Sequence, residues 1–163
     1  MRIFYAAERR MEKILDTADR RILRELQRDS SRSVAQIAEA IGLCHAPCWR
    51  RIQRLRSDGF ITREAAVLDR AKLDWEVELF VFIKISPNGR ANIEEFRRSI
   101  MQHDRVIGYY IVLGIFDAMF HVVAKNLNDY NEFYLEHLAA SPYINEINSM
   151  AVLSQLKDAD IPV

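Results

Sequence analysis

Apolar residues recur at two different spacings in the two halves of the chain. Up to Gly59 they recur every three or four positions, as in Ile37, Ala38 and Ile41, which is typical of amphipathic helices. From Val77 onward, short runs such as VELFVFIKI are rich in β-branched and aromatic residues, which favours strands. The pattern therefore predicts a helical N-terminal part and a mixed α and β C-terminal part.

The stretch from Ser33 to Gly59 predicts two short helices joined by a tight turn. Ser33 is a good N-cap, because its hydroxyl can accept a hydrogen bond from a free backbone N–H. Gly42 can end the first helix in a left-handed conformation. The second helix begins at about Cys44 or His45 and ends just before Gly59. This order is that of a helix-turn-helix, in which the second helix enters a DNA major groove.

The segments on either side of this stretch complete a winged domain. A helix from about Ala18 to Arg28, capped by Asp16 or Thr17, is expected to supply the third element of the core. After the helix-turn-helix, the runs 60–63 and 65–68 favour two short strands, at the place where a wing would lie.

The second helix of the helix-turn-helix carries four arginines and no acid. At 100° per residue, Cys48, Ile52 and Leu55 fall on the side that faces the core. The opposite side is expected to face DNA and carries Ala46, Arg50, Gln53 and Arg54. Arg51 and Arg56 flank the core side, where their long stems can lie over apolar surface and their heads can reach phosphates. The alternative is a merely solvated helix face, although such faces usually mix charges of both signs.

From residue 77 the predicted order is strand, helix, strand, strand, helix, strand, which is the ferredoxin-like βαββαβ arrangement. The strands are expected at 77–85, 106–113, 118–124 and 144–153, and the helices near 93–101 and 127–138. Helices on one face would leave the other face of the sheet open. Phe80, Phe82, Tyr110 and Phe120 would line one face or the other, so we expect two chains to dimerise sheet to sheet.

Charge supports a division into two modules. Residues 1–63 hold 14 Lys and Arg against 8 Asp and Glu, whereas the other 100 residues hold 9 against 15. The first part suits a polyanion such as double-stranded DNA, and the second would repel one. We therefore predict a DNA-binding domain at 1–63, a linker at 64–76 and an effector and oligomerisation domain at 77–163, with no function assigned to residues 1–13. Without a membrane-length apolar run or a visible signal peptide, a cytoplasmic protein is expected.

Two other functional classes compete with DNA binding. Cys44 and His45 with Cys48 would suit a thiol or metal sensor, but a closed structural zinc site normally draws ligand pairs from two segments. An enzyme would need a catalytic group, and Asp117 with His121 would be about 13 Å apart on one strand. We therefore predict no catalytic residue, no metal ligand and no cofactor.

The loop Gly114-Ile115-Phe116-Asp117 is the candidate small-molecule site. Its glycine would let a ligand approach the backbone, and Ile115 and Phe116 could cover an apolar side chain. The Asp117 carboxylate could bind an ammonium group. The same four residues also suit an ordinary hairpin turn in which the aspartate bonds the backbone, and the residues alone leave both readings open.

The segments LDTADRRIL, GLCHAPCWRRIQRLRSDGFI and LGIFDAMFHV, in this order, resemble the Lrp/AsnC (feast/famine) family of transcription regulators from Ile14 onward. The resemblance implies a dimer or a higher oligomer such as a tetramer, often an octamer, that binds operator DNA and responds to a small molecule, usually an amino acid. It also implies an effector site around the loop joining the second and third strands, where Gly114 and Asp117 match the family. Cys44 and Ala118 depart from it, since the family usually has Ser or Thr at the first position and often an aromatic residue at the second.

Overall fold

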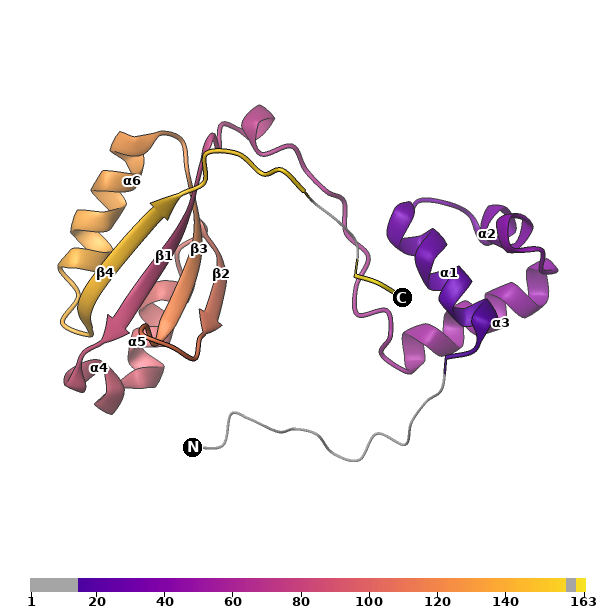
Figure 1. Cartoon of the computed structure of the whole chain (residues 1–163), viewed down its shortest axis with the longest axis horizontal. Coiled ribbons are helices and arrows are strands. Elements are labelled where there is room, and N and C mark those ends of the chain that lie inside the picture. The colour runs from indigo at the N-terminus through magenta and orange to yellow at the C-terminus, as the bar shows by residue number, and fades with distance from the viewer. Residues whose placement is uncertain (1–14, 158–160) are drawn as a thin grey trace. The chain divides into compact units, whose positions relative to one another are not determined.

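The computed structural model describes residues 15–157 and 161–163, which belong to two compact units (Figure 1). One unit ends at Val67 and also includes residues 161–163, and the other comprises Leu68–Lys157. This differs from the predicted division, which placed every residue from 77 onward in the second domain. The predicted N-terminal extension, residues 1–13, lies outside the described residues.

The first unit, called the helical unit below, contains the predicted helix-turn-helix. Its helices are α1 (Thr17–Arg28), α2 (Val34–Ile41) and α3 (His45–Ser57). Ser33 caps α2, because its hydroxyl accepts from the Gln36 backbone N–H while the Gln36 side chain accepts from the Ser33 N–H. Gly42 follows with φ of 71°, a left-handed conformation that lets the chain turn directly into α3.

One apolar core holds the three helices together. Ile22 of α1, Ile37 of α2 and Ile52 of α3 are each at most 1% exposed. Val163 packs against this core, and its main-chain oxygen accepts hydrogen bonds from Nε and Nη2 of Arg24 at 2.9 and 2.6 Å. The last residues therefore belong to the helical unit through contacts with α1.

The two predicted wing strands are wrong, since residues 58–70 contain no strand. The chain instead turns back on α3, where the backbone N–H groups of Phe60 and Ile61 both donate to the Leu55 carbonyl oxygen. Phe60 and Ile61 pack on the helical core, and Val67 is 96% exposed. The apolar residues at 60–61 thus serve the helices, and an isolated two-stranded hairpin has little stability of its own.

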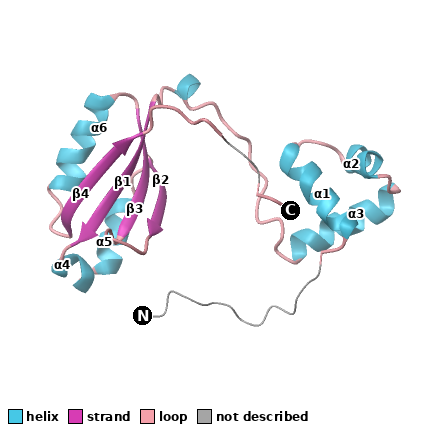
Figure 2. Ribbon diagram, viewed as in Figure 1, coloured by secondary structure: helices cyan, strands magenta, loops and turns pink. Residues whose placement is uncertain are grey.

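The second unit, called the sheet unit below, has the predicted βαββαβ order (Figure 2). Its elements are β1 (Val77–Ile85), α4 (Pro87–Ala91), α5 (Ile93–Met101), β2 (Val106–Ile111), β3 (Ala118–Ala124), α6 (Leu127–Phe133), a π-helical continuation (Tyr134–Ala139) and β4 (Ile144–Ala151). A short 3-10 turn (Ala71–Leu73) precedes them. The four strands are antiparallel in the order β2-β3-β1-β4. The break expected at Pro87 is the extra helix α4, because Ser86 caps a turn that starts with proline.

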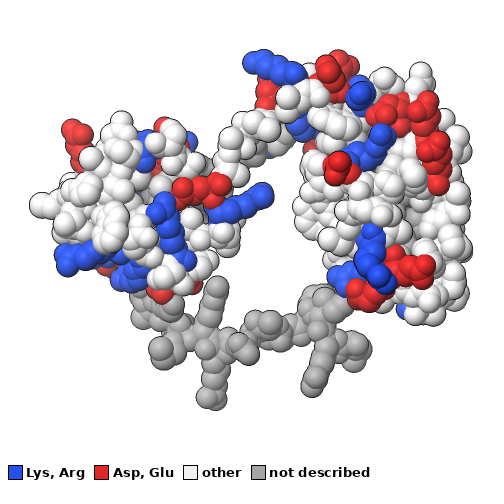
Figure 3. Space-filling model, turned by 180° about the vertical axis from the view of Figure 1, so that it is seen from behind, with Lys and Arg blue, Asp and Glu red and all other residues white. Residues whose placement is uncertain are grey.

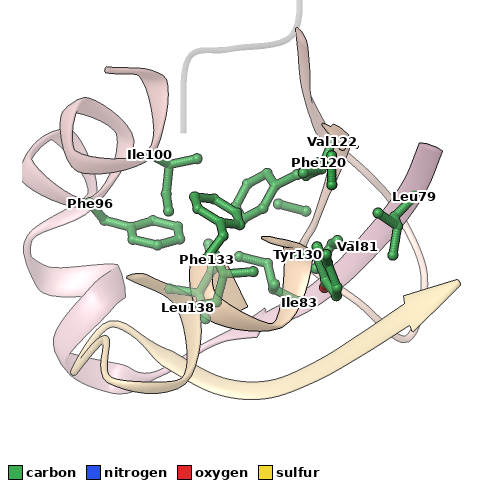
Figure 4. Close-up of a cluster of buried hydrophobic side chains, with 13 residues drawn as sticks. Leu79, Val81, Ile83, Phe96, Ile100, Phe120, Val122, Tyr130, Phe133 and Leu138 are labelled. Carbon is green, nitrogen blue, oxygen red and sulfur yellow. The ribbon is translucent and has the colours of Figure 1, made fainter. Parts of the chain in front are cut away.

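Alternation along β1 sends one set of side chains to the helices and the other to the opposite face. Leu79, Val81 and Ile83 are buried against Phe96 of α5 and Phe133 of α6 (Figure 4). The opposite face, called the open face below, contains two cross-strand rows. These rows are Tyr110-Met119-Phe82-Asn148 and Gly108-His121-Phe80-Met150. Of the residues expected on either face, Phe120 therefore lies in the core and Phe80, Phe82 and Tyr110 lie on the open face.

Candidate DNA-binding and effector sites

Helix α3 presents a basic surface because its apolar side is fully used by the core. Cys48, Ile52 and Leu55 are at most 1% exposed, as the helical wheel predicts. Ala46 and Arg50 are exposed, and Gln53 is half-buried. Figure 3 shows Lys and Arg side chains gathered over one part of the helical unit. Pro47, Arg50, Arg51 and Arg54 line a shallow hollow of about 310 Å³ on this surface.

Two of the four arginines are bound to acids of α1. Arg51 Nη1 donates to Asp16 Oδ2 at 2.6 Å and to Asp19 Oδ1 at 2.8 Å, and Arg54 Nη2 donates to Asp19 Oδ2 at 2.5 Å. Hydrogen bonds to Asp16 and then to Asp19 raise the pKa of Arg51. The Asp19 backbone N–H, followed by the Arg51 side chain, lowers the pKa of Asp16. The structure thus brings Arg51 and Arg54 together, although the sequence placed them on different sides of the helix.

Arg50 and Arg56 have different surroundings. Arg56 forms an exposed ion pair with Glu64 at 2.5 Å. Arg50 has no hydrogen bond or ion pair with any residue in the described part of the chain, so its guanidinium is available to an external anion.

Sequence reasoning missed Asp19, the buried acid of this site. A signal was present, because Asp19, Ile22 and Leu23 recur at helical spacing and all three are buried. An acid on the apolar side of one helix, next to a helix rich in arginine, points to a buried ion pair.

The two cysteines lie in different environments. Cys44 is the exposed N-cap residue of α3 and makes no capping hydrogen bond with its side chain. Cys48 is in the core, where burial raises the pKa of its thiol. Among residues 15–157 and 161–163, no group of three His, Cys, Asp or Glu side chains is placed to hold a metal ion.

The predicted effector loop follows β2 at one end of the sheet. Gly114 has φ of 156°, which L side chains rarely adopt, and no atom beyond Gly114 and its two chain neighbours lies within 4 Å of where a Cβ would be. Ile115 is 79% exposed, while the Phe116 ring lies 5.6 Å from that of Phe82. Leu113, just before the loop, is fully exposed. The loop therefore leaves apolar surface uncovered in the single chain.

Asp117 connects this loop to β1 and α4. Its backbone N–H donates to the Ile83 carbonyl oxygen at 2.9 Å, and its Oδ2 accepts from the Ile85 N–H at 2.9 Å. Arg90 Nη2 lies 3.4 Å from both carboxylate oxygens. Asp117 thus hydrogen-bonds the backbone, as expected for a hairpin turn, but the bonded N–H belongs to Ile85 of β1, which is 32 residues away in the sequence. Its side chain stays 36% exposed next to one cation, Arg90.

His121 and Asp117 have different contact partners. Its Nε2 pairs with the Glu78 carboxylate, and its ring stacks on Phe80 at 4.8 Å. The Glu78 carboxylate also binds Arg70 at 2.5 Å. His121 thus contacts Glu78 and Phe80 on the open face and does not pair with Asp117.

None of the helices in the described ranges is long and apolar enough to cross a membrane.

Family models match both parts of the chain. Residues 15–56 match the AsnC-type helix-turn-helix domain, and residues 78–162 match the Lrp/AsnC ligand binding domain. The chain is 30% identical to the DNA-binding transcriptional activator DecR of Escherichia coli K12, over 88% of this chain and 95% of that protein. It is 31% identical to the transcriptional regulator AzlB of Bacillus subtilis 168, over 92% and 96%.

Solved structures show the same arrangement of elements. An AsnC family transcriptional regulator from Agrobacterium tumefaciens aligns with a TM-score of 0.83 and 34% identity, over 91% of this chain and 97% of that one. The complex of the transcriptional regulator NMB0573 from Neisseria meningitidis with L-Met aligns with a TM-score of 0.84 and 24% identity, over 89% and 94%. Together with the helix-turn-helix and the βαββαβ sheet, these matches show that the chain belongs to the Lrp/AsnC family of DNA-binding transcription regulators.

Proposed function

We propose that this regulator binds operator DNA through α3 and that an amino acid bound at the loop 114–117 sets the strength of that binding. It would act in the cytoplasm as a dimer or a larger assembly of dimers, and by binding alone, without catalysis or a cofactor.

The observation that carries the DNA proposal is Arg50, which is exposed on α3 opposite the core and has no partner in the described part of the chain. A guanidinium in this position can donate two hydrogen bonds to O6 and N7 of guanine. Ala46 and Gln53 share the outer part of α3 and would contact the same groove. Arg51, Arg54 and Arg56 would contact phosphates with the N–H donors that their ion pairs leave free.

The Arg50→Ala variant tests this proposal. The binding free energy for a duplex selected by the wild-type chain should weaken by about 1–3 kcal/mol, and that for a scrambled duplex should weaken much less. Fluorescence anisotropy at fixed salt measures both affinities. Arg98→Ala, which removes an exposed arginine from α5, is the matched control and should leave both affinities unchanged. Equal losses on the two duplexes for Arg50→Ala would show that this residue does not read bases.

The effector proposal is supported by the chemistry at the end of β2. An amino acid carries an ammonium and a carboxylate, and the exposed Arg90–Asp117 pair offers one group of each sign. Leu113 and Ile115 offer apolar surface to its side chain. The L-Met complex of NMB0573 and the L-methionine complex of Rv3291c, a feast or famine regulatory protein of M. tuberculosis, make amino acids the first ligands to test.

A thermal-shift screen of the twenty amino acids finds the ligand, because a molecule that binds only the folded state raises its stability. We expect one or a few apolar L-amino acids to raise the melting temperature and their D-enantiomers to have no effect. A screen without any stabilising amino acid would remove the support for this class of effector.

The open face supports assembly through the sheets. Phe80 and Phe82 are only half-buried there, and Tyr110 and Met150 are about half exposed. A second copy of the face would cover these side chains with a self-complementary surface. Phe82→Glu should therefore produce a monomer in light scattering at micromolar concentration, whereas Gln102→Glu, just after α5, should leave the assembly intact.

A further inference from the structure

Asp19 is the one charged residue that is fully buried in the described part of the chain. Burying a carboxylate is costly unless each oxygen has a partner. Both oxygens of Asp19 are satisfied, since Oδ1 accepts from Arg51 and Oδ2 accepts from Arg54 and from the Asp16 backbone N–H at 3.1 Å. The carboxylate therefore holds the start of α1 and two arginine side chains of α3 in place.

This cluster removes net charge from α3. Asp16, Asp19, Arg51 and Arg54 carry two negative and two positive charges, so the group is neutral as a whole. The four arginines of α3 thus overstate the positive charge that the helix offers to DNA. The long-range electrostatic attraction between α3 and DNA of any sequence is therefore weaker than four unpaired arginines would give.

The same contacts hold the two guanidinium groups in place. The side chains of Arg51 and Arg54 remain 31% and 49% exposed, so each keeps N–H donors that reach solvent. An arginine that is anchored at one end of its guanidinium can donate in a fixed direction, but it cannot follow a phosphate that lies elsewhere. Anchoring therefore favours DNA whose backbone fits α3 over DNA whose backbone does not.

We propose that Asp19 is a positioning residue for DNA recognition, which fixes the directions of Arg51 and Arg54 and so raises the preference of α3 for its operator over other DNA. The proposal rests on the proposed placement of α3 in the groove. It assigns to an acid of the first helix an effect on specificity without any contact between that acid and DNA.

The test uses the full chain with Asp19→Asn and measures affinity for two duplexes over a series of salt concentrations. One duplex is selected by the wild-type chain from a random pool, and the other is scrambled. Because Arg51 and Arg54 would no longer be held in the directions that fit the operator backbone, the affinity ratio between the two duplexes should fall about tenfold. Affinity for the scrambled duplex should rise, and its salt slope should steepen by about 0.9 for each new phosphate contact.

Two further variants keep the proposal falsifiable. Asp16→Asn keeps the N-cap of α1 but removes one carboxylate from Arg51, so it should show a smaller change of the same sign in a chain that folds. Glu25→Gln makes the same charge change at an acid that binds Arg28 and Arg32, away from α3. It should leave the affinity ratio unchanged.

Equal loss of affinity for both duplexes with an unchanged salt slope would show that Asp19 is only structural and would overturn the proposal. An equal effect of Glu25→Gln and Asp19→Asn would also overturn it, because net charge alone would then explain the result. If the wild-type chain itself did not distinguish the duplexes, the proposed function would fail instead.

Discussion

Asp19 in the helical unit and Asp117 in the sheet unit both bind partners 32 or 35 residues away in the sequence. The Asp19 side chain is 1% exposed and has two arginines as partners, so the fold needs its charge. The Asp117 side chain is 36% exposed, and its best hydrogen bond is to a backbone N–H. There the backbone contact needs only an oxygen acceptor, and the carboxylate is otherwise in contact with Arg90 at the surface. The comparison separates a buried acid that holds two arginines in place from a partly exposed acid whose carboxylate still reaches solvent.

The largest effect should come from Asp19→Ala, which removes a buried carboxylate partner from Arg54 and leaves Arg51 with Asp16. Breaking a buried ion pair by removing one partner costs about 3–5 kcal/mol. Half of each arginine or less is exposed here, so we expect about 2–3 kcal/mol after solvent screening. Urea unfolding of a Trp75→Phe background measures this, since Trp49 on α3 is then the single tryptophan reporter. Glu25→Ala is the control and should cost clearly less. A cost below that of Glu25→Ala would contradict the importance of the buried charge.

A smaller effect is expected at Asp117, with a difference between two substitutions. Asp117→Ala leaves the Ile85 N–H without its acceptor and should cost about 1–3 kcal/mol, because Ile85 is buried. Asp117→Asn keeps an oxygen there and should cost much less. A Trp49→Phe background makes Trp75, in the sheet unit, the reporter. Similar losses for Ala and Asn would mean that the charge itself supports the loop, and the contrast with Asp19 would disappear.

The smallest effect is expected where a charged contact is exposed. Arg24→Gln removes the hydrogen bonds that hold the Val163 main-chain oxygen on α1. Exposed charged contacts contribute about 0–1 kcal/mol, so the unfolding midpoint should move only slightly. If Arg24→Gln lowered the free energy of unfolding as much as Asp19→Ala does, burial would not explain the difference between the exposed Arg24 contact and the buried Asp19 contact.

The sequence predicted the parts whose pattern repeats locally. Ile37, Ala38 and Ile41 indicate α2, and the β-branched and aromatic residues of the run VELFVFIKI indicate β1; both elements form as expected. The wing failed because Phe60 and Ile61 have the composition of a strand, but the helical core offers them a better place to be buried. Local strand propensity does not show that the helical core competes with a hairpin for these two side chains.

The pairing of charges could not be predicted in the same way. A helical wheel places Arg54 on the outer side of α3, but it does not show that α1 brings Asp19 within reach of it. Likewise, the residues of the loop left Asp117 open between a turn and a ligand site. The contact of Asp117 with the Ile85 N–H depends on the pairing of β1 with β3, which the residues of the loop do not contain.

The most direct test of regulation is the operator affinity of the wild-type chain and of Asp117→Asn, each with and without the amino acid found by thermal shift. Because the substitution removes the charge and keeps the acceptor for Ile85, the fold and the affinity without ligand should be unchanged. We predict that the amino acid changes the operator affinity of the wild-type chain by about 5–150-fold, the usual range of coupling between sites, and has no effect on the variant. Asp104→Asn, an exposed acid elsewhere in the sheet unit, should respond like the wild type. An unchanged ligand response in Asp117→Asn would contradict a role for this carboxylate in the effector site and would place the effector elsewhere.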